Sequence, residues 1–338
     1  MSAKTVNGTL EAAVVTHTKP LGWLGMVQRQ GALIALIGLY VFGVVRYGEA
    51  FAVGANLGNF MADVVKYALL ALGMSFVILG AGIDLSVGSV MLLGGVIAGQ
   101  SSAMGALPGF GSALLVGMAV GLVNGLLIAK LHLEPFIVTL ATQLAVRGIA
   151  LLLCDRRSVV ASPEGNFQAV GQARLVGVPV SVIFMVLIFV AGAMVLHYSS
   201  FGRDVLAFGG NEQAARLMGL PVERSKALTY VISGGCAGLA GALLISQNGS
   251  INPGAGVGWE MSAIAAVVVG GTLLSGGVGS IMGSLVGVIL LQLIFNLIVF
   301  ENGRGGITIS PYWESVIRGG FLLFVVLLQV RLARKRAV

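Results

Sequence analysis

Long, uninterrupted apolar segments run through this 338-residue sequence and restrict the structures that it can form. A helix needs about 20 mostly apolar residues to cross the hydrocarbon core of a bilayer. Within lipid every backbone N–H and C=O must find a partner inside the protein, so spanning structures are helices or closed barrels. The apolar segments here do not alternate with a period of two, which favours helices. The sequence therefore predicts an all-α, polytopic membrane helix bundle.

About ten spans can be placed along the chain. The first and the eighth are short, and the breaks around Asp84 and around Gly276-Gly277 are either loops or kinks within a helix. The spans cover residues 31–45, 61–81, 86–104, 112–131, 136–154, 176–198, 227–247, 261–275, 278–300 and 313–332.

Charged residues are scarce and unevenly placed. They make up 10% of the sequence, whereas soluble domains carry about 25%, and the formal net charge is +7. Lys and Arg collect in the cytoplasmic loops of membrane proteins, which explains this basic balance without nucleic acid. Their positions place both termini in the cytoplasm. We expect a cytoplasmic N-terminal tail over 1–30, a membrane domain over 31–332 and a basic cytoplasmic tail over 333–338.

Metal and nucleotide sites are not indicated. Cys154 and Cys236 lie far apart in apolar surroundings, as buried free thiols do. The three His residues show no metal-ligand spacing. The motif G-x-x-x-x-G-K-[ST] is absent, so the chain has no phosphate-cradling loop. We expect neither an enzyme nor a bound cofactor.

One long polar insert, residues 199–226, separates two spans. Asn211 can cap a helix, and Glu212 would lie in the positively polarised first turn. Gly219 and Pro221 end the helical pattern. The insert thus predicts one short helix, which is too short to be stable alone. It is either a turn at the membrane surface or a plug for a cytoplasmic partner.

Four stretches of the sequence contain motifs that can be compared with a known family. The insert contains Phe201-Gly202-Arg203, Ala207, Gly209-Gly210-Asn211, Ala214-Ala215, Leu217 and Gly219. The others are GIDLSVGS at 82–89, TLA at 139–141 with RG at 147–148, and EMSAIAAVVVGGTLLSGGVG at 260–279. Together they cover about 60–330 and resemble the permease subunits of bacterial ABC importers for ribose-type monosaccharides. The sequence of residues 260–279 and the C-terminal motif Trp313…Arg318-Gly319 most resemble the galactofuranose-type branch of this family.

The resemblance implies a type II ABC importer-like fold. It implies a permease in the bacterial inner membrane, surrounded by lipid, that passes a monosaccharide from a periplasmic sugar-binding protein to the cytoplasm. ATP and Mg²⁺ would be held by a cytoplasmic ABC ATPase, and a second permease chain, identical or different, would complete the passage. The insert would be the coupling loop that fits a cleft in the ATPase. The residues placed at that contact are Arg203, Asn211, Glu212, Ala214, Ala215, Arg216 and Gly219.

Ionisable residues inside a span cost at least about 2.5–3.5 kcal/mol and need a reason. Asp84 is either a cap that accepts a hydrogen bond from the N–H of Ser86 or Val87, or part of a conformational gate. A different class of function, an ion-coupled secondary transporter, would use Asp84 as its proton or sodium site. Arg147 is expected to snorkel or to bind carbonyl groups or a carboxylate, and Glu260 to stand at the end of a span.

A neutral sugar needs hydroxyl and amide partners and aromatic faces along its path. The candidates on the predicted spans are Ser75, Phe76, Asp84, Ser86, Asn124, Thr139, Gln143 and Asn296.

Overall fold

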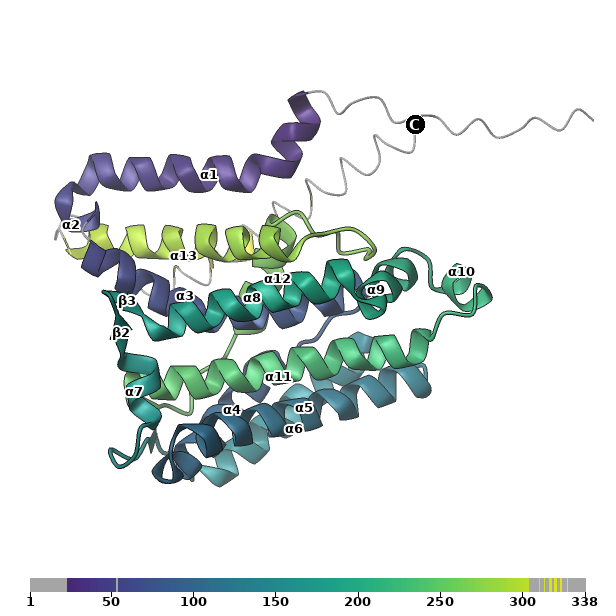
Figure 1. The fold of residues 1–338 in the computed structure, drawn as a ribbon, viewed down its shortest axis with the longest axis horizontal. Coiled ribbons are helices and arrows are strands. Elements are labelled where there is room, and N and C mark those ends of the chain that lie inside the picture. The colour runs from purple at the N-terminus through teal and green to yellow at the C-terminus, as the bar shows by residue number, and fades with distance from the viewer. Residues whose placement is uncertain are drawn as a thin grey trace, which may run out of the picture.

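A computed structural model gives the fold of the chain (Figure 1). It describes residues 23–52 and 54–303 and scattered positions between 310 and 327. Most of the predicted N-terminal tail, the C-terminal tail and most of the predicted span 313–332 lie outside the described residues.

Helices make up most of the described chain. In order they are α1 (Trp23–Tyr47), α2 (Glu49–Ala52), α3 (Gly54–Leu79), α4 (Val87–Ser101), η1 (Ser102–Met104), α5 (Ala106–Lys130), α6 (Pro135–Leu153), α7 (Phe167–Gln172), α8 (Val180–Tyr198), α9 (Ser200–Gly210), α10 (Glu212–Leu217), α11 (Val222–Asn248), α12 (Trp259–Val269) and α13 (Ile281–Gly303). Two short antiparallel pairs join β1 (Val159–Val160) to β4 (Ser250–Ile251) and β2 (Arg174–Leu175) to β3 (Val178–Pro179).

Seven helices of the described chain are long and apolar enough to cross a membrane: α3, α4 with η1, α5, α6, α8, α11 and α13. Two shorter apolar helices, Gly31–Tyr47 within α1 and α12, correspond to the predicted spans 31–45 and 261–275. The chain is thus an all-α membrane bundle, as predicted. Seven long and two shorter apolar helices account for nine of the ten predicted spans. The tenth predicted span, 313–332, is described only at scattered residues.

The helices run side by side, so the bundle has two ends (Figure 1). One carries α10 and the other carries α7 with the β2–β3 hairpin; we refer to them as the α10 end and the α7 end. α1 lies along the outside of the bundle, next to α13. At the α7 end the hydroxyl of Tyr47 donates a hydrogen bond to Glu301 at 2.8 Å, which ties these two helices together.

α11 forms the centre of the bundle and packs against α3, α4 and α5. Glycine permits the closest of these contacts. A Cβ on Gly234 would collide with the carbonyl oxygen of Gly117, and a Cβ on Gly121 would collide with that of Tyr230. The backbones of α5 and α11 therefore touch directly, which is how helices associate where lipid supplies no hydrophobic force between them.

Three non-helical segments interrupt the helices of the described bundle. Residues 80–86 separate α3 from α4, residues 252–258 lead from β4 into α12, and residues 270–280 separate α12 from α13. The predicted break near Asp84 is therefore an interruption and not a kink. Irregular backbone of this kind is tolerated at membrane depth where protein surrounds it or where it lines a cavity.

The predicted span 261–275 is wrong at its end. α12 stops at Val269, and the following residues up to 280 are not helical. Gly271 adopts a φ of 93°, a conformation that continues no helix and that glycine reaches at no steric cost. The predicted span 176–198 is wrong at its start, because residues 174–179 form the β2–β3 hairpin and α8 begins at Val180.

The insert 199–226 also differs from its prediction of one short helix. It contains α9 and α10, and α11 begins inside it at Val222. α9 starts at Ser199, whose Oγ accepts a hydrogen bond from the N–H of Gly202 at 3.0 Å. The sequence did not predict α9 because the segment contains several glycines, and glycine weakens helices that are not held by tertiary contacts.

Candidate functional site

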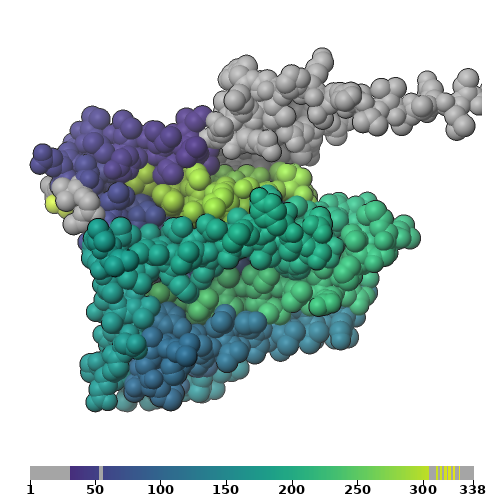
Figure 2. Space-filling view, in the orientation of Figure 1, coloured from purple at the N-terminus to yellow at the C-terminus, as the bar shows by residue number. Residues whose placement is uncertain are grey.

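α10 and its flanking turns form the tip of the insert, which stands out from the body of the bundle (Figure 2). Asn211 accepts a hydrogen bond from the N–H of Ala214 at 2.9 Å, so the predicted cap is confirmed. At the other end Gly219 has a φ of 76°, which lets the N–H of Leu220 reach the carbonyl of Ala215 at 3.1 Å. The predicted stop at Gly219 is confirmed by this left-handed turn.

Ion pairs fasten the tip to α11. Glu212 accepts hydrogen bonds from Lys226 at 2.6 Å and from Arg216 at 3.0 Å, and Arg216 also reaches Glu223 at 3.1 Å. Burial raises the pKa of Glu212, but the hydrogen bonds from Lys226 and Arg216 outweigh burial and hold this pKa below its ordinary value of 4.5. The hydrogen bonds to Glu212 and Glu223 raise the pKa of Arg216. Glu212 and Arg216 therefore hold the loop in shape within this chain.

The tip exposes two large apolar side chains. Leu217 is 90% exposed and Met218 is 68% exposed, whereas Ala215 is fully buried. Arg203 and Asn211 are also exposed. Ala215, placed by the family resemblance at a contact with a partner, faces the interior of its own chain. The sequence showed an Ala/Leu/Met face but not which of its members point outward.

α9 connects the tip to the end of α3, where the 80–86 interruption begins, and to the non-helical segment 270–280. A Cβ on Gly209 would collide with the carbonyl oxygen of Leu79, the last residue of α3, and would lie 2.8 Å from the nitrogen of Gly277. The N–H of Gly277 donates to the same carbonyl of Leu79 at 2.9 Å. The end of α3, the end of α9 and the segment 270–280 thus meet backbone to backbone.

Ser75 and Phe76, candidates for the sugar path, lie in contacts between helices. Ser75 donates a hydrogen bond to Ser284 of α13 at 2.8 Å, and both residues are buried. The ring of Phe76 packs against that of Phe201 in α9, with 5.9 Å between centroids. These side chains join α3 to its neighbours.

A chain of hydrogen bonds surrounds the α3–α4 interruption. Thr142 donates to Asn124 at 2.6 Å, and Asn124 donates to Ser86 at 3.0 Å. Ser86 donates to one carboxylate oxygen of Asp84 at 2.6 Å, and Ser233 donates to the other at 2.7 Å. The chain links the interruption to α5, α6 and α11. The sequence identified Asp84, Ser86 and Asn124 but missed Thr142 and Ser233, which are ordinary small residues on apolar helices.

Asp84 is 1% exposed and also accepts a hydrogen bond from the N–H of Ser86 at 3.0 Å. The predicted local hydrogen bond, donated by the N–H of Ser86 to Asp84, is therefore confirmed. Thr139, another candidate, is buried beside the same interruption and donates to the carbonyl of Pro135 at 2.8 Å and to that of Ile83 at 3.4 Å.

Arg147 of α6 binds the 252–258 segment, and Glu260 of α12 bonds to α6. Arg147 donates to the carbonyl of Pro253 at 2.6 Å and to that of Ala255 at 2.7 Å, so its prediction as a carbonyl binder is confirmed. Gln143 donates to Glu260 at 3.3 Å. Glu260 lies in the first turn of α12, as expected, and is buried.

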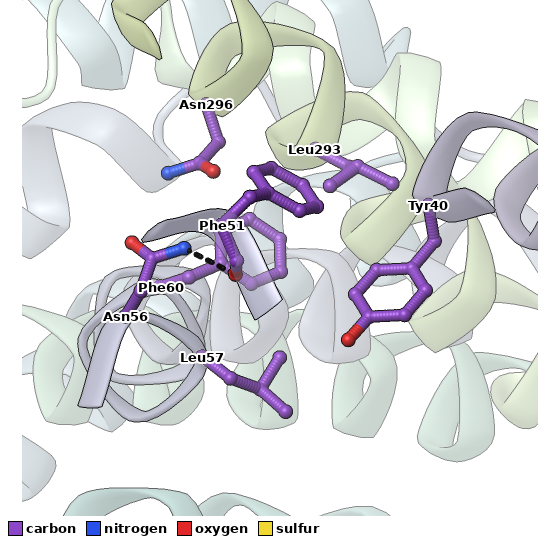
Figure 3. A pocket seen from close by; sticks show the side chains of 7 residues that line it. All are labelled: Tyr40, Phe51, Asn56, Leu57, Phe60, Leu293 and Asn296. Atoms are coloured by element: carbon purple, nitrogen blue, oxygen red, sulfur yellow. Dashed lines mark hydrogen bonds between the residues drawn. The ribbon is translucent and has the colours of Figure 1, made fainter. Parts of the chain in front are cut away.

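Asn296 lines a small pocket together with Phe51, Asn56 and Phe60 (Figure 3). The amide of Asn56 donates to the carbonyl of Phe51 at 3.0 Å. The pocket has a volume of about 10 Å³, which is room for about one water molecule. A sugar does not fit at Asn296.

Comparison with known proteins gives a consistent family. Residues 56–326 match the family described as branched-chain amino acid transport system / permease component. A ribose import permease of Bacillus subtilis is 37% identical over 93% of this chain and 96% of its own length. An Escherichia coli K12 ribose import permease is 36% identical over 90% and 94%, and an L-arabinose ABC transporter permease of Azospirillum brasilense is 32% identical over 100% and 98%.

No solved structure matches the chain significantly. The family match covers most of the chain, and the relatives match from end to end, which agrees with the four motifs of the sequence and with the membrane bundle. The chain is a multi-pass membrane protein and belongs to this family of transport-system permease components.

Proposed function

We propose that this chain is the permease subunit of an ATP-driven ABC importer for a monosaccharide. The relatives named above are permeases for ribose and L-arabinose, which supports a monosaccharide as the substrate class. The observation that carries the proposal is the exposed apolar tip at Leu217 and Met218, which connects through α9 to the end of α3.

The tip offers what a coupling contact needs. Its apolar face is presented to a partner, while Lys226, Glu212 and Arg216 hold it in one shape. A cytoplasmic ATPase that binds Leu217 and Met218 and closes around ATP would move α9. Because Gly209 touches the carbonyl of Leu79, that movement would reach the segments 80–86 and 270–280.

The proposal assigns a side of the membrane to each end of the bundle. The α10 end and both termini would lie in the cytoplasm of a bacterium, and the α7 end would face a periplasmic sugar-binding protein. A second permease chain would complete the passage; it could be the same chain or, as in the galactofuranose-type systems, a different one. ATP and Mg²⁺ would be bound by the ATPase and not by this chain.

The ion-coupled alternative is not supported by the comparisons, because the relatives are permeases of sugar import systems. Both carboxylate oxygens of Asp84 also accept hydrogen bonds from serine side chains in the buried chain described above. This arrangement favours a structural role for Asp84 at the α3–α4 interruption.

The substitution Leu217→Asp tests the coupling contact. A carboxylate in an apolar interface loses most of its hydration, so we expect sugar uptake to fall by about tenfold or more in proteoliposomes that contain the permease, its ATPase and its binding protein. ATP hydrolysis should no longer respond to the loaded binding protein.

Leu131→Asp is the matched control. Leu131 is an exposed leucine just after α5, outside the α9–α10 segment, and its substitution should leave uptake unchanged. Normal uptake with Leu217→Asp would contradict the coupling role of the tip, and uptake that continues without ATP would contradict the proposed function itself.

A further inference from the structure

A polar pocket of about 360 Å³ lies between α3, the end of α11 and the segment that leads into α12. The side chains important to the argument are Lys66, Tyr67, Asn248, Ser250, Asn252 and Trp259. Small-molecule sites typically have volumes of about 300–1,000 Å³. The pocket is lined by none of the eight path candidates selected from the sequence.

Its lining combines aromatic rings with amides. The rings of Tyr67 and Trp259 lie 4.5 Å apart between centroids and are partly exposed. Asn248 and Asn252 are exposed, and neither amide has a hydrogen bond to another part of the described chain. Each amide offers two donors and one acceptor oxygen. A sugar is complementary to this lining, because its C–H faces can pack against the rings and its hydroxyl groups can bond to the amides.

The charge of the pocket favours a neutral ligand. Lys66 contributes an ammonium group, but its Nζ lies 2.6 Å from the carboxylate of Asp63. The ammonium also lies 5.7 Å from the centroid of the Tyr67 ring. Because Lys66 is already paired, the pocket has no uncompensated charge from these two residues to select an anion.

One wall of the pocket is held rigidly from outside. Arg147 fixes the carbonyls of Pro253 and Ala255 with hydrogen bonds of 2.6 and 2.7 Å. A Cβ on Gly88 of α4 would collide with the carbonyl of Gly256, so α4 supports the same segment directly. A wall that is fixed before the ligand arrives lowers the entropic cost of binding. Arg147 thus acts as a positioning residue for Asn252.

The pocket lies toward the α7 end. Asn59, seven residues before Lys66 on α3, accepts a hydrogen bond from Arg174 of the β2–β3 hairpin. Ser250 belongs to β4, which pairs with β1. In the orientation proposed above, this is the side from which sugar arrives.

We propose that this pocket binds a neutral monosaccharide during its passage through the permease, with Asn248 and Asn252 as hydrogen-bonding residues and Tyr67 and Trp259 as the aromatic platform. The proposal rests on the function proposed above and adds a site and its ligand class to it.

The test uses the complete transporter in proteoliposomes, with saturating loaded binding protein and either ribose or L-arabinose. We expect the double substitution Asn248→Ala and Asn252→Ala to lower the sugar moved per ATP hydrolysed by about tenfold, as the loss of hydrogen bonds from two amides implies. Gln100→Ala, which removes an exposed amide of α4 that bonds to Leu153 and lies outside the pocket, should leave this ratio unchanged. If the double variant does not assemble, Asn252→Ser serves in its place.

A second readout follows binding directly. In the detergent-purified complex without binding protein, ribose or L-arabinose should change the tryptophan fluorescence, and Trp259→Phe should abolish the change. A charged sugar such as glucuronate should have no effect. If the double variant moves as much sugar per ATP hydrolysed as the wild-type protein, the proposed sugar site is wrong and the proposed function still stands. If the wild-type transporter moves no sugar when ATP is supplied, the proposed function is wrong, and so is the proposed sugar site.

Discussion

The carboxylate of Asp84 accepts three hydrogen bonds, two from Ser86 and one from Ser233. A buried carboxylate is costly unless such bonds compensate for its lost hydration. Here the same bonds fix a segment without helical structure to the centre of α11. Asp84 thus helps to hold the segment between α3 and α4 in place.

Replacement of Asp84 should destabilise the protein in a graded way. Asp84→Ala leaves the hydroxyl groups of Ser86 and Ser233 without their acceptor, and each buried unsatisfied group costs about 1–3 kcal/mol. Asp84→Asn keeps one acceptor oxygen and should cost less. Thermal unfolding in detergent should give the order Ala below Asn below the unchanged protein. Equal melting temperatures for the Ala variant and the unchanged protein would contradict this account.

The α9–α10 element depends on pH through Glu212. Since the pKa of Glu212 lies below 4.5 in the folded loop, its ion pairs stabilise the loop fully above that value and are lost as the pH falls through the lowered pKa. A spin label at Gln213→Cys, an exposed position of α10, should therefore become more mobile below about pH 4.5. In a Glu212→Gln background the label should be mobile at neutral pH as well. Mobility that stays constant in both proteins would show that the ion pairs do not hold the tip.

Prediction from sequence worked where a signal is local and failed where it depends on neighbours. The Asn211 cap and the Gly219 stop could be predicted because each acts on its own turn. α9 could not, because its glycines destabilise a helix alone and become favourable only where Gly209 touches Leu79. The pocket at Asn248, Asn252 and Trp259 was missed for a similar reason: α3, α11 and the segment before α12 come together only in the fold.

At the scale of the whole molecule, the two ends of the bundle have different surfaces. The α10 end carries a charged loop with an apolar tip, and the α7 end carries short β pairs and a polar pocket. The interruptions at 80–86 and 270–280 contact α9, whereas the segment 252–258 lines the pocket. An ATP-driven importer needs two different ends, because ATP is hydrolysed on one side of the membrane and the substrate arrives on the other.

The proposed function requires the two ends to lie on opposite sides of the membrane, with α10 inside the cell. Leu217 at the α10 end is 90% exposed, and Val176 in the β2–β3 hairpin is 97% exposed. In a background without Cys154 and Cys236, a membrane-impermeant maleimide should label Val176→Cys in cells whose outer membrane has been made permeable. It should label Leu217→Cys only after the inner membrane is opened. Labelling of Leu217→Cys from outside would place the tip away from any ATPase, and the coupling role of α10 would be lost.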